Sequence, residues 1–194
     1  MSRFAERITR EELHQLPLGS FEGEINIVTD DKGMDIALDY LYKCPVVGFD
    51  TETRPSFKKG SVNSVAILQL SDEHKAFIFK LKQIGLPDAL ASFLSDTRII
   101  KVGAAIKDDL IKLRVLRDFE PGGFVELQSL AQVLKIESYS VRKLAGIVLG
   151  IRISKSQQVS NWESGELSES QIRYAATDAW VCFQVYKEFL KELE

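Results

Sequence analysis

The sequence predicts an α/β layer fold in which a mixed β-sheet is flanked by helices. Segments typical of strands dominate the first half of the chain, strands and helices then alternate, and helical patterns alone fill the C-terminal part. No Pro-, Gly- or Ser-rich stretch divides the 194 residues. The chain therefore predicts one domain, residues 24–194, preceded by a short lead-in, residues 1–23.

Six segments have the pattern of β-strands. The first alternates between apolar and polar residues, and the others are short apolar runs bounded by turn-forming residues. These segments are Glu24–Val28, Val46–Phe49, Val65–Leu70, Ala76–Phe79, Ile99–Val102 and Phe124–Val125. A polar turn, residues 71–74, joins the third and fourth segments, so these two are expected to pair with each other.

Helical patterns account for most of the remaining chain. Thr9 and Glu12 have capping-box spacing, which predicts a short N-terminal helix. Ser168 and Gln171 repeat that spacing and predict the start of a long helix that runs to Leu193. The other predicted helices are Met34–Leu41, Pro87–Leu94, Ile106–Leu116, Leu127–Leu134 and Val141–Leu149.

The composition restricts the class of protein. With 45% hydrophobic and 27% charged residues, an ordinary globular core is expected. No apolar run is long enough to cross a membrane, and the first residues lack a secretory apolar stretch. Cys44 and Cys182 have no metal-type spacing, so we expect a reduced, soluble, cytoplasmic protein. The net charge of −3 neither supports nor excludes a nucleic-acid partner.

Asp50 and Glu52 follow a very apolar strand and share one face of it, because side chains two apart in a strand point the same way. Two such carboxylates repel each other unless a cation lies between them, and Mg²⁺ and Mn²⁺ prefer oxygen ligands. An acidic exit from the strand is an equal interpretation at this stage. The same spacing occurs at Glu22/Glu24 and at Asp118/Glu120.

Two further positions bear on the same chemistry. Asp108 and Asp109 lie in the first turn of a predicted helix, where acidic residues also serve as helix caps. Tyr174 and Asp178 are four apart on the long C-terminal helix and share a face. A phenol beside a carboxylate-held metal can hydrogen-bond to a water molecule, although an amphipathic helix with Tyr174 in the core explains the pattern equally well.

Three segments together identify a family resemblance. Phe49–Glu52, Val102–Asp109 and Tyr174–Ala179 occur in the order of the three exonuclease motifs of the DEDD superfamily, tyrosine subclass. The chain resembles ribonuclease D and, more closely, the exonuclease domain of Werner-syndrome-type proteins, from about Ile25 to Leu190. This resemblance implies a ribonuclease H-like fold.

The resemblance also implies roles for individual residues. The four carboxylates that hold two divalent ions, Mg²⁺ or Mn²⁺, would be Asp50, Glu52, Asp109 and Asp178. Asp109 is preferred to Asp108 because the family acid is the later of the adjacent pair. Tyr174 corresponds to the tyrosine that positions the attacking water, so the catalytic set is these four acids with Tyr174.

The implied activity is 3′–5′ exonuclease hydrolysis of DNA or RNA, with release of nucleoside 5′-monophosphates. The expected partner is a nucleic-acid 3′ end, with no membrane and no obligate protein partner. Thr51, Arg54, Lys58 and Lys155 are candidate substrate contacts. Two alternatives remain open, a ribonuclease H-like endonuclease and a non-catalytic module that binds nucleic acid or protein on the same fold.

Arg142 and Lys143 are expected on a solvated helix face, and Trp162 in the core or as a loop anchor.

Overall fold

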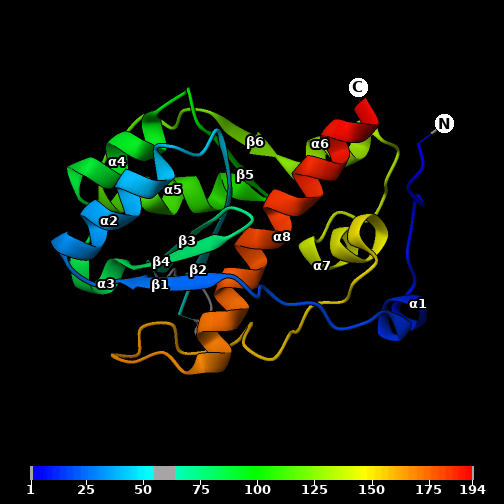
Figure 1. Ribbon diagram of the computed structural model, residues 1–194, viewed down its shortest axis with the longest axis horizontal. Coiled ribbons are helices and arrows are strands. Elements are labelled where there is room, and N and C mark those ends of the chain that lie inside the picture. Colours follow the sequence, from blue (N-terminus) through cyan, green and yellow to red (C-terminus); the bar gives the residue numbers. More distant parts are fainter. Residues whose placement is uncertain (1, 55–63, 194) are drawn as a thin grey trace.

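The computed structural model describes residues 2–54 and 64–193 and contains a six-stranded sheet in the order β1-β4-β3-β2-β5-β6 (Figure 1). β3 is antiparallel to both β2 and β4, whereas β1 and β4, β2 and β5, and β5 and β6 pair in parallel. The strands are β1 (Glu24–Val28), β2 (Val46–Thr53), β3 (Val65–Ser71), β4 (Lys75–Lys80), β5 (Ile100–Gly103) and β6 (Phe124–Glu126). The expected mixed sheet is thus confirmed.

The helices lie mainly between and after the strands. Before the sheet and between its first strands lie α1 (Arg10–Gln15) and α2 (Asp31–Leu41). The later helices are α3 (Leu81–Ile84), α4 (Asp88–Ser95), α5 (Ile106–Leu116), α6 (Leu127–Val133), α7 (Val141–Leu144), the π-helical turn η1 (Ala145–Leu149) and α8 (Glu169–Leu193). Among the residues that the structure describes, none of these helices has the length and apolarity to cross a membrane.

Both predicted capping boxes form. The Thr9 side chain accepts from the Glu12 amide, and the Glu12 carboxylate accepts from the Thr9 amide. One predicted helix differs from the structure. Residues 141–149 do not form a continuous α-helix, because α7 gives way to the π-helical turn η1 at Ala145.

The central strands send alternate side chains to opposite faces of the sheet. On one face, residues such as Phe49 and Leu68 join a core with α2, α4 and α5. On the other, Ile67 and Ile78 pack with Ala175 of α8. α8 crosses this second face and contacts β1 to β5 (Figure 1). It therefore brings residues from the end of the sequence over the middle of the sheet.

Gly48 sets how closely α8 approaches β2. A Cβ atom on this residue would lie 1.8 Å from the carbonyl oxygen of Ala179 and 3.0 Å from the amide nitrogen of Phe183. Both neighbours are backbone atoms of α8, so no side-chain rotation relieves the overlap. Only glycine allows this strand and this helix to pack at the observed separation.

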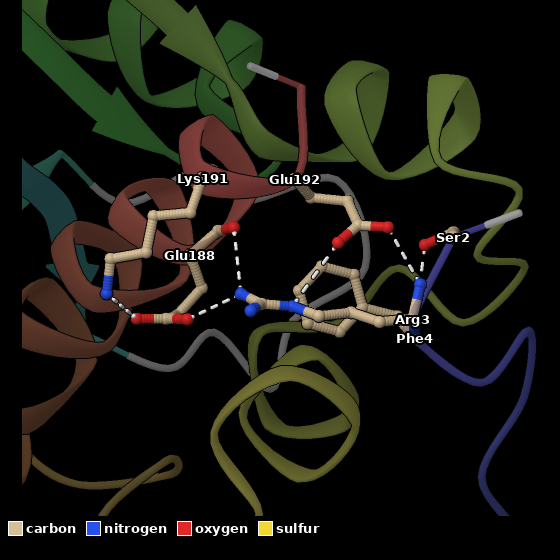
Figure 2. A network of polar contacts seen from close by, with 6 residues as sticks. All are labelled: Ser2, Arg3, Phe4, Glu188, Lys191 and Glu192. Carbon is tan, nitrogen blue, oxygen red and sulfur yellow. Dashed lines mark hydrogen bonds and ion pairs between the residues drawn. The ribbon is translucent and has the colours of Figure 1, made fainter.

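The N-terminal lead-in is held against the rest of the protein by contacts at several points. Figure 2 shows Arg3 between two carboxylates of α8, with its guanidinium 2.6 Å from Glu188 and its amide 2.7 Å from Glu192. The Phe4 ring packs at 5.8 Å from Phe189. Further along, backbone bonds join residues 17–19 to Arg152. The lead-in is therefore placed by contacts along its whole length.

Gly48→Ala is expected to destabilise the protein by about 1–3 kcal/mol, because α8 must move away from β2. Urea unfolding measures this change. Gly165→Ala is the matched control, since a Cβ atom there meets nothing within 4 Å of the described structure. Equal stability of the two variants would contradict the close approach.

Candidate active site

Three carboxylates from two elements meet above the sheet. Asp50 and Glu52 project from β2 and Asp178 projects from α8, and one carboxylate oxygen of each lies within 4.8 Å of the others. All three side chains are half-buried. The pairing register shifts between Glu52 and Thr53, as in a β-bulge, and such an irregularity re-aims the neighbouring side chains.

The pKa values of these carboxyls are all raised. Loss of water contacts raises the pKa of Asp50 well above its usual range, and the neighbouring charges of Asp178, Glu52 and Asp109 add to the effect. Loss of water also raises the pKa of Glu52 to about 8, followed by repulsion from Asp178 and Asp109. For Asp178, burial raises the pKa to about 7, opposed by a hydrogen bond from Tyr174 and by the charge of Arg142.

Asp109 lies beside this triad and is held by Thr51. The Thr51 hydroxyl donates to the Asp109 carboxylate at 2.6 Å. Asp109 lies outside the group of oxygens within 4.8 Å, yet its charge raises the pKa of both Asp50 and Glu52. Asp108, its neighbour in α5, is exposed. The structure therefore separates the two acids, and only Asp109 faces the other carboxylates.

Neither Asp108 nor Asp109 caps α5, although capping was an alternative explanation for them. The helix begins at Ala105, which has a left-handed φ of 59° and no side-chain cap of its own. Its first amides are satisfied from β6, because the Glu126 carboxylate accepts from the Ala105 and Ile106 amides at 3.0 Å each. Glu126 thus fixes the start of the helix that carries Asp109.

Tyr174 lies one helical turn before Asp178 and is half-buried. Its ring packs against Trp162 at 5.9 Å, and Trp162 is only 1% exposed, which confirms it as a core residue. Burial, together with the negative charges of Asp178 and Glu52, raises the pKa of the Tyr174 hydroxyl. The phenol therefore stays protonated and acts as a hydrogen-bond donor toward the carboxylates.

Gln69 adds a buried polar group beside Asp50. The two residues are directly opposite in the β2–β3 register, so their side chains share the face covered by α8. Gln69 is 0% exposed, and neither its amide nitrogen nor its amide oxygen has a hydrogen-bond partner among the described residues. A buried amide without partners costs about 1–3 kcal/mol, which indicates a further polar group at this place.

The donor set fits a hard divalent cation. Carboxylate oxygens are the ligands that Mg²⁺ and Mn²⁺ prefer, and three of them converge here from different elements. Burial and, for Asp50 and Glu52, repulsion from neighbouring acids raise the pKa values of these carboxyls, so their charged forms are disfavoured without a cation. A bound cation would remove the repulsion and keep all the carboxyls ionised.

The candidate substrate contacts lie in different surroundings. Thr51 is buried, and its hydroxyl is engaged with Asp109. Arg54 forms an ion pair with Glu163 at 3.4 Å. Lys155 is exposed. Lys58 lies outside the described residues.

Sequence reasoning missed Gly48, Gln69 and Glu126 as residues that shape the site. A glycine inside an apolar strand often marks a place where another backbone approaches closely, so the role of Gly48 could have been predicted from the sequence. Glu126 follows a short strand, as capping acids often do. Gln69 is hidden within an apolar run, and only the register reveals that it faces Asp50.

A mixed sheet is thus crossed by one long helix, and carboxylates from both converge on one candidate metal site. A family model described as 3'-5' exonuclease matches residues 25–194. The chain therefore belongs to this 3'-5' exonuclease family, as its motifs predicted.

Individual relatives agree with this assignment. The mouse bifunctional 3'-5' exonuclease/ATP-dependent helicase WRN is 38% identical over 151 residues, which are 74% of this chain and 11% of that protein. This chain spans between 11% and 53% of the length of the first curated relatives it matches.

Solved structures confirm the ribonuclease H-like fold. The EXO domain of Aedes aegypti Nibbler gives a TM-score of 0.81, with 22% identity over 90% of this chain and 92% of that one. Escherichia coli RNase D gives 0.78, with 20% identity over 87% of this chain and 45% of that one.

The raised pKa values predict how the metal-free protein responds to pH. In the folded state the pKa is about 7 for Asp178 and about 8 for Glu52, above the unfolded values of 3.8 and 4.5. Folding therefore binds protons at pH values between the unfolded and folded pKa values. The contribution of these two carboxyls to the free energy of unfolding is complete below about pH 4 and is lost as pH rises through about 8.

We expect the free energy of unfolding in EDTA to fall by more than about 1.4 kcal/mol, the equivalent of one pKa unit, between about pH 5 and 8. Urea titrations at several pH values measure it. Asp178→Asn removes one titrating group and should flatten the curve. Stability that rises over this range would rule out the repulsion among the carboxyls.

Thr51→Val should lower Mn²⁺ affinity by about 10–100-fold, because it frees Asp109 from the hydrogen bond that orients it. Thr51→Ser keeps the hydroxyl and is expected to restore most of the affinity. Thermal unfolding of both variants controls for general damage. Wild-type affinity in Thr51→Val would show that the hydrogen bond does not position Asp109.

Proposed function

We propose that this protein removes nucleotides one at a time from the 3′ end of DNA or RNA and releases nucleoside 5′-monophosphates, using two divalent ions, Mg²⁺ or Mn²⁺. The observation that carries the proposal is the convergence of Asp50, Glu52 and Asp178, with oxygens within 4.8 Å, beneath the Tyr174 hydroxyl. Membership of the 3'-5' exonuclease family supports the same reaction.

Each acid has a role in this proposal. The two ions would be held by Asp50, Glu52, Asp178 and Asp109, with Asp50 as the central ligand and Asp109 as a supporting one. When bound, the ions lower the pKa of the attacking water and stabilise negative charge on the departing 3′ oxygen.

The protein's own residues orient the reactants. Tyr174 keeps its proton because its pKa is raised, so it donates a hydrogen bond and does not act as a general base. We assign it to hold the attacking water in line with the scissile phosphorus. Thr51 holds Asp109 at a fixed place, and Trp162 supports the ring of Tyr174.

The substrate class follows from the relatives only in outline. The mouse relative is named a 3'-5' exonuclease and helicase, and an RNase D of Trypanosoma brucei was crystallised with RNA. We therefore include both DNA and RNA 3′ ends. A cytoplasmic location and the absence of an obligate protein partner remain predictions from composition.

A 5′-labelled single strand of DNA or RNA, incubated with Mg²⁺ or Mn²⁺, tests the proposal. Successive shortening from the 3′ end is expected, with EDTA abolishing it. Internal cuts would favour a ribonuclease H-like endonuclease. Binding without any cleavage over a range of DNA and RNA substrates would favour a non-catalytic module.

Neighbouring acids provide a matched pair of variants. Asp109→Asn should lower kcat by at least about 100-fold, the scale of a lost transition-state contact. Asp108→Asn makes the same chemical change on the adjacent, exposed residue and should keep near wild-type activity. Equal loss in both variants would contradict the assignment of Asp109.

A further inference from the structure

A cavity lined by positively charged side chains lies near the carboxylate site. It has a volume of about 310 Å³ and lies between α1, α7 and the segment after η1. Among the residues that the structure describes, no carboxylate lines it, and five basic side chains do: Arg10, His14, Arg142, Arg152 and Lys155. This is an unusual surface for a protein whose net charge is −3.

The positive charge in this cavity is not neutralised within the described protein. None of Arg10, Arg142, Arg152 and Lys155 forms an ion pair with a described carboxylate, whereas cations elsewhere, such as Arg3 and Lys187, do so. The Asp178 carboxylate acts on Arg142 from beyond ion-pair distance, but four cations gathered without a described ion pair repel one another and attract an anion.

Two of these arginines are held in place by backbone oxygens. Arg142 donates from Nε to the Ile153 carbonyl at 3.4 Å, and Arg152 donates from Nε to the Leu16 carbonyl at 3.0 Å. Arg142, expected on a solvated face, is instead half-buried. Because only the Nε atom of each arginine makes these bonds, the two terminal guanidinium nitrogens have no described partner. They are therefore available to bind a phosphate group.

This cavity is contiguous with the carboxylate site. A neighbouring cavity of about 210 Å³, lined by Tyr174 and Asp178, shares Leu18, Ile153 and Ser154 with it. The charge of Arg142 also acts on the Tyr174 and Asp178 side chains. The basic cavity therefore borders, across three shared lining residues, the cavity that Tyr174 and Asp178 line.

The lead-in supplies part of this surface. Arg10 and His14 lie on α1, outside residues 25–194 that match the exonuclease family. At one end, the lead-in is fixed by the ion pair of Arg3 with Glu188 of α8, as Figure 2 shows. At the other end, it is fixed by the β-bridge between Leu18 and Arg152. Arg10 is thus held over the site by contacts of the lead-in itself.

We propose that this basic cavity binds the sugar-phosphate backbone of the substrate strand, on the 5′ side of the bond to be cut. The inference rests on the proposed 3′–5′ exonuclease function. In that reaction the scissile phosphate occupies the carboxylate site, so every other phosphate of the strand lies on its 5′ side. The lead-in is then part of the substrate-binding surface and extends it beyond residues 25–194, which match the family.

The test uses the double variant Arg10→Gln/Lys155→Gln in the full chain. Both side chains are exposed and make no described hydrogen bond or ion pair, so the fold should persist. On a 12-nucleotide single strand we expect a higher KM, with a smaller change in kcat. The slope of log Kd against log salt should fall by about 1.4, or about 0.7 for each lost phosphate contact.

Lys32→Gln/Lys43→Gln is the matched control, because it removes the same charge from the other end of the molecule, on and after α2. Its KM and salt slope should equal those of the wild type. The ratio of variant to wild-type KM should grow with strand length, from the dinucleotide to the 12-mer. An equal effect on the dinucleotide would instead assign the cavity to the terminal nucleotide or its product.

Failure of the inference can be told from failure of the proposed function. If the wild type shortens the strand and the double variant has the same KM and salt slope, the basic cavity does not bind the backbone. If the wild type shortens no strand at all, the exonuclease proposal itself fails. A change in the control as large as in the double variant would also overturn the inference, since the effect would then be one of net charge.

Discussion

The close approach of α8 to β2 is the constraint on which the site depends. Gly48 permits it, because any Cβ atom there would overlap the backbone of Ala179. The approach sets Asp178 against Asp50 and Glu52, and the protein provides Arg142 as a nearby cation but no direct ion pair for them among the described residues. Like charges so placed oppose folding at neutral pH unless protons or cations join them. The same geometry that destabilises the metal-free protein therefore makes it a binding site for divalent ions.

Supporting residues fix each functional side chain from a different part of the chain. Thr51 orients Asp109 from β2, and Glu126 fixes the start of α5 from β6. Lys80, which is buried, donates to the Ser164 carbonyl at 2.9 Å and so holds the loop that carries Trp162 against Tyr174. Because these supports come from the sheet, the helices transmit its rigidity to the site. The basic cavity shows the same principle, since its arginines are held by backbone carbonyls while their charges face outward.

Much of this arrangement follows from local sequence rules, and the remainder does not. All six strands were predictable, the first because it alternates between apolar and polar residues and the others because each is a short apolar run bounded by turn residues, and helix periodicity was enough to pair Tyr174 with Asp178. Periodicity could not show that α7 would end at Leu144, because the chain changes there from α-helical to π-helical hydrogen bonding while the apolar spacing continues. Nor could it show that Arg10 and Arg142 line one cavity, since they are far apart in the chain. The hydrogen bond from Thr51 distinguishes Asp109 from Asp108, and the pairing register opposite Asp50 distinguishes Gln69 from its apolar neighbours.

The central claim is that buried, mutually repelling carboxyls exist here to hold divalent cations. Calorimetric titration of the metal-free protein with Mn²⁺ near neutral pH, repeated in buffers of different ionisation enthalpy, tests it most directly. The account predicts that binding releases protons, because carboxyls such as Asp178, with a pKa of about 7, are partly protonated before the metal arrives. It also predicts that Asp178→Asn reduces both the affinity and the number of protons released. Binding without proton release, or unchanged binding in that variant, would contradict it.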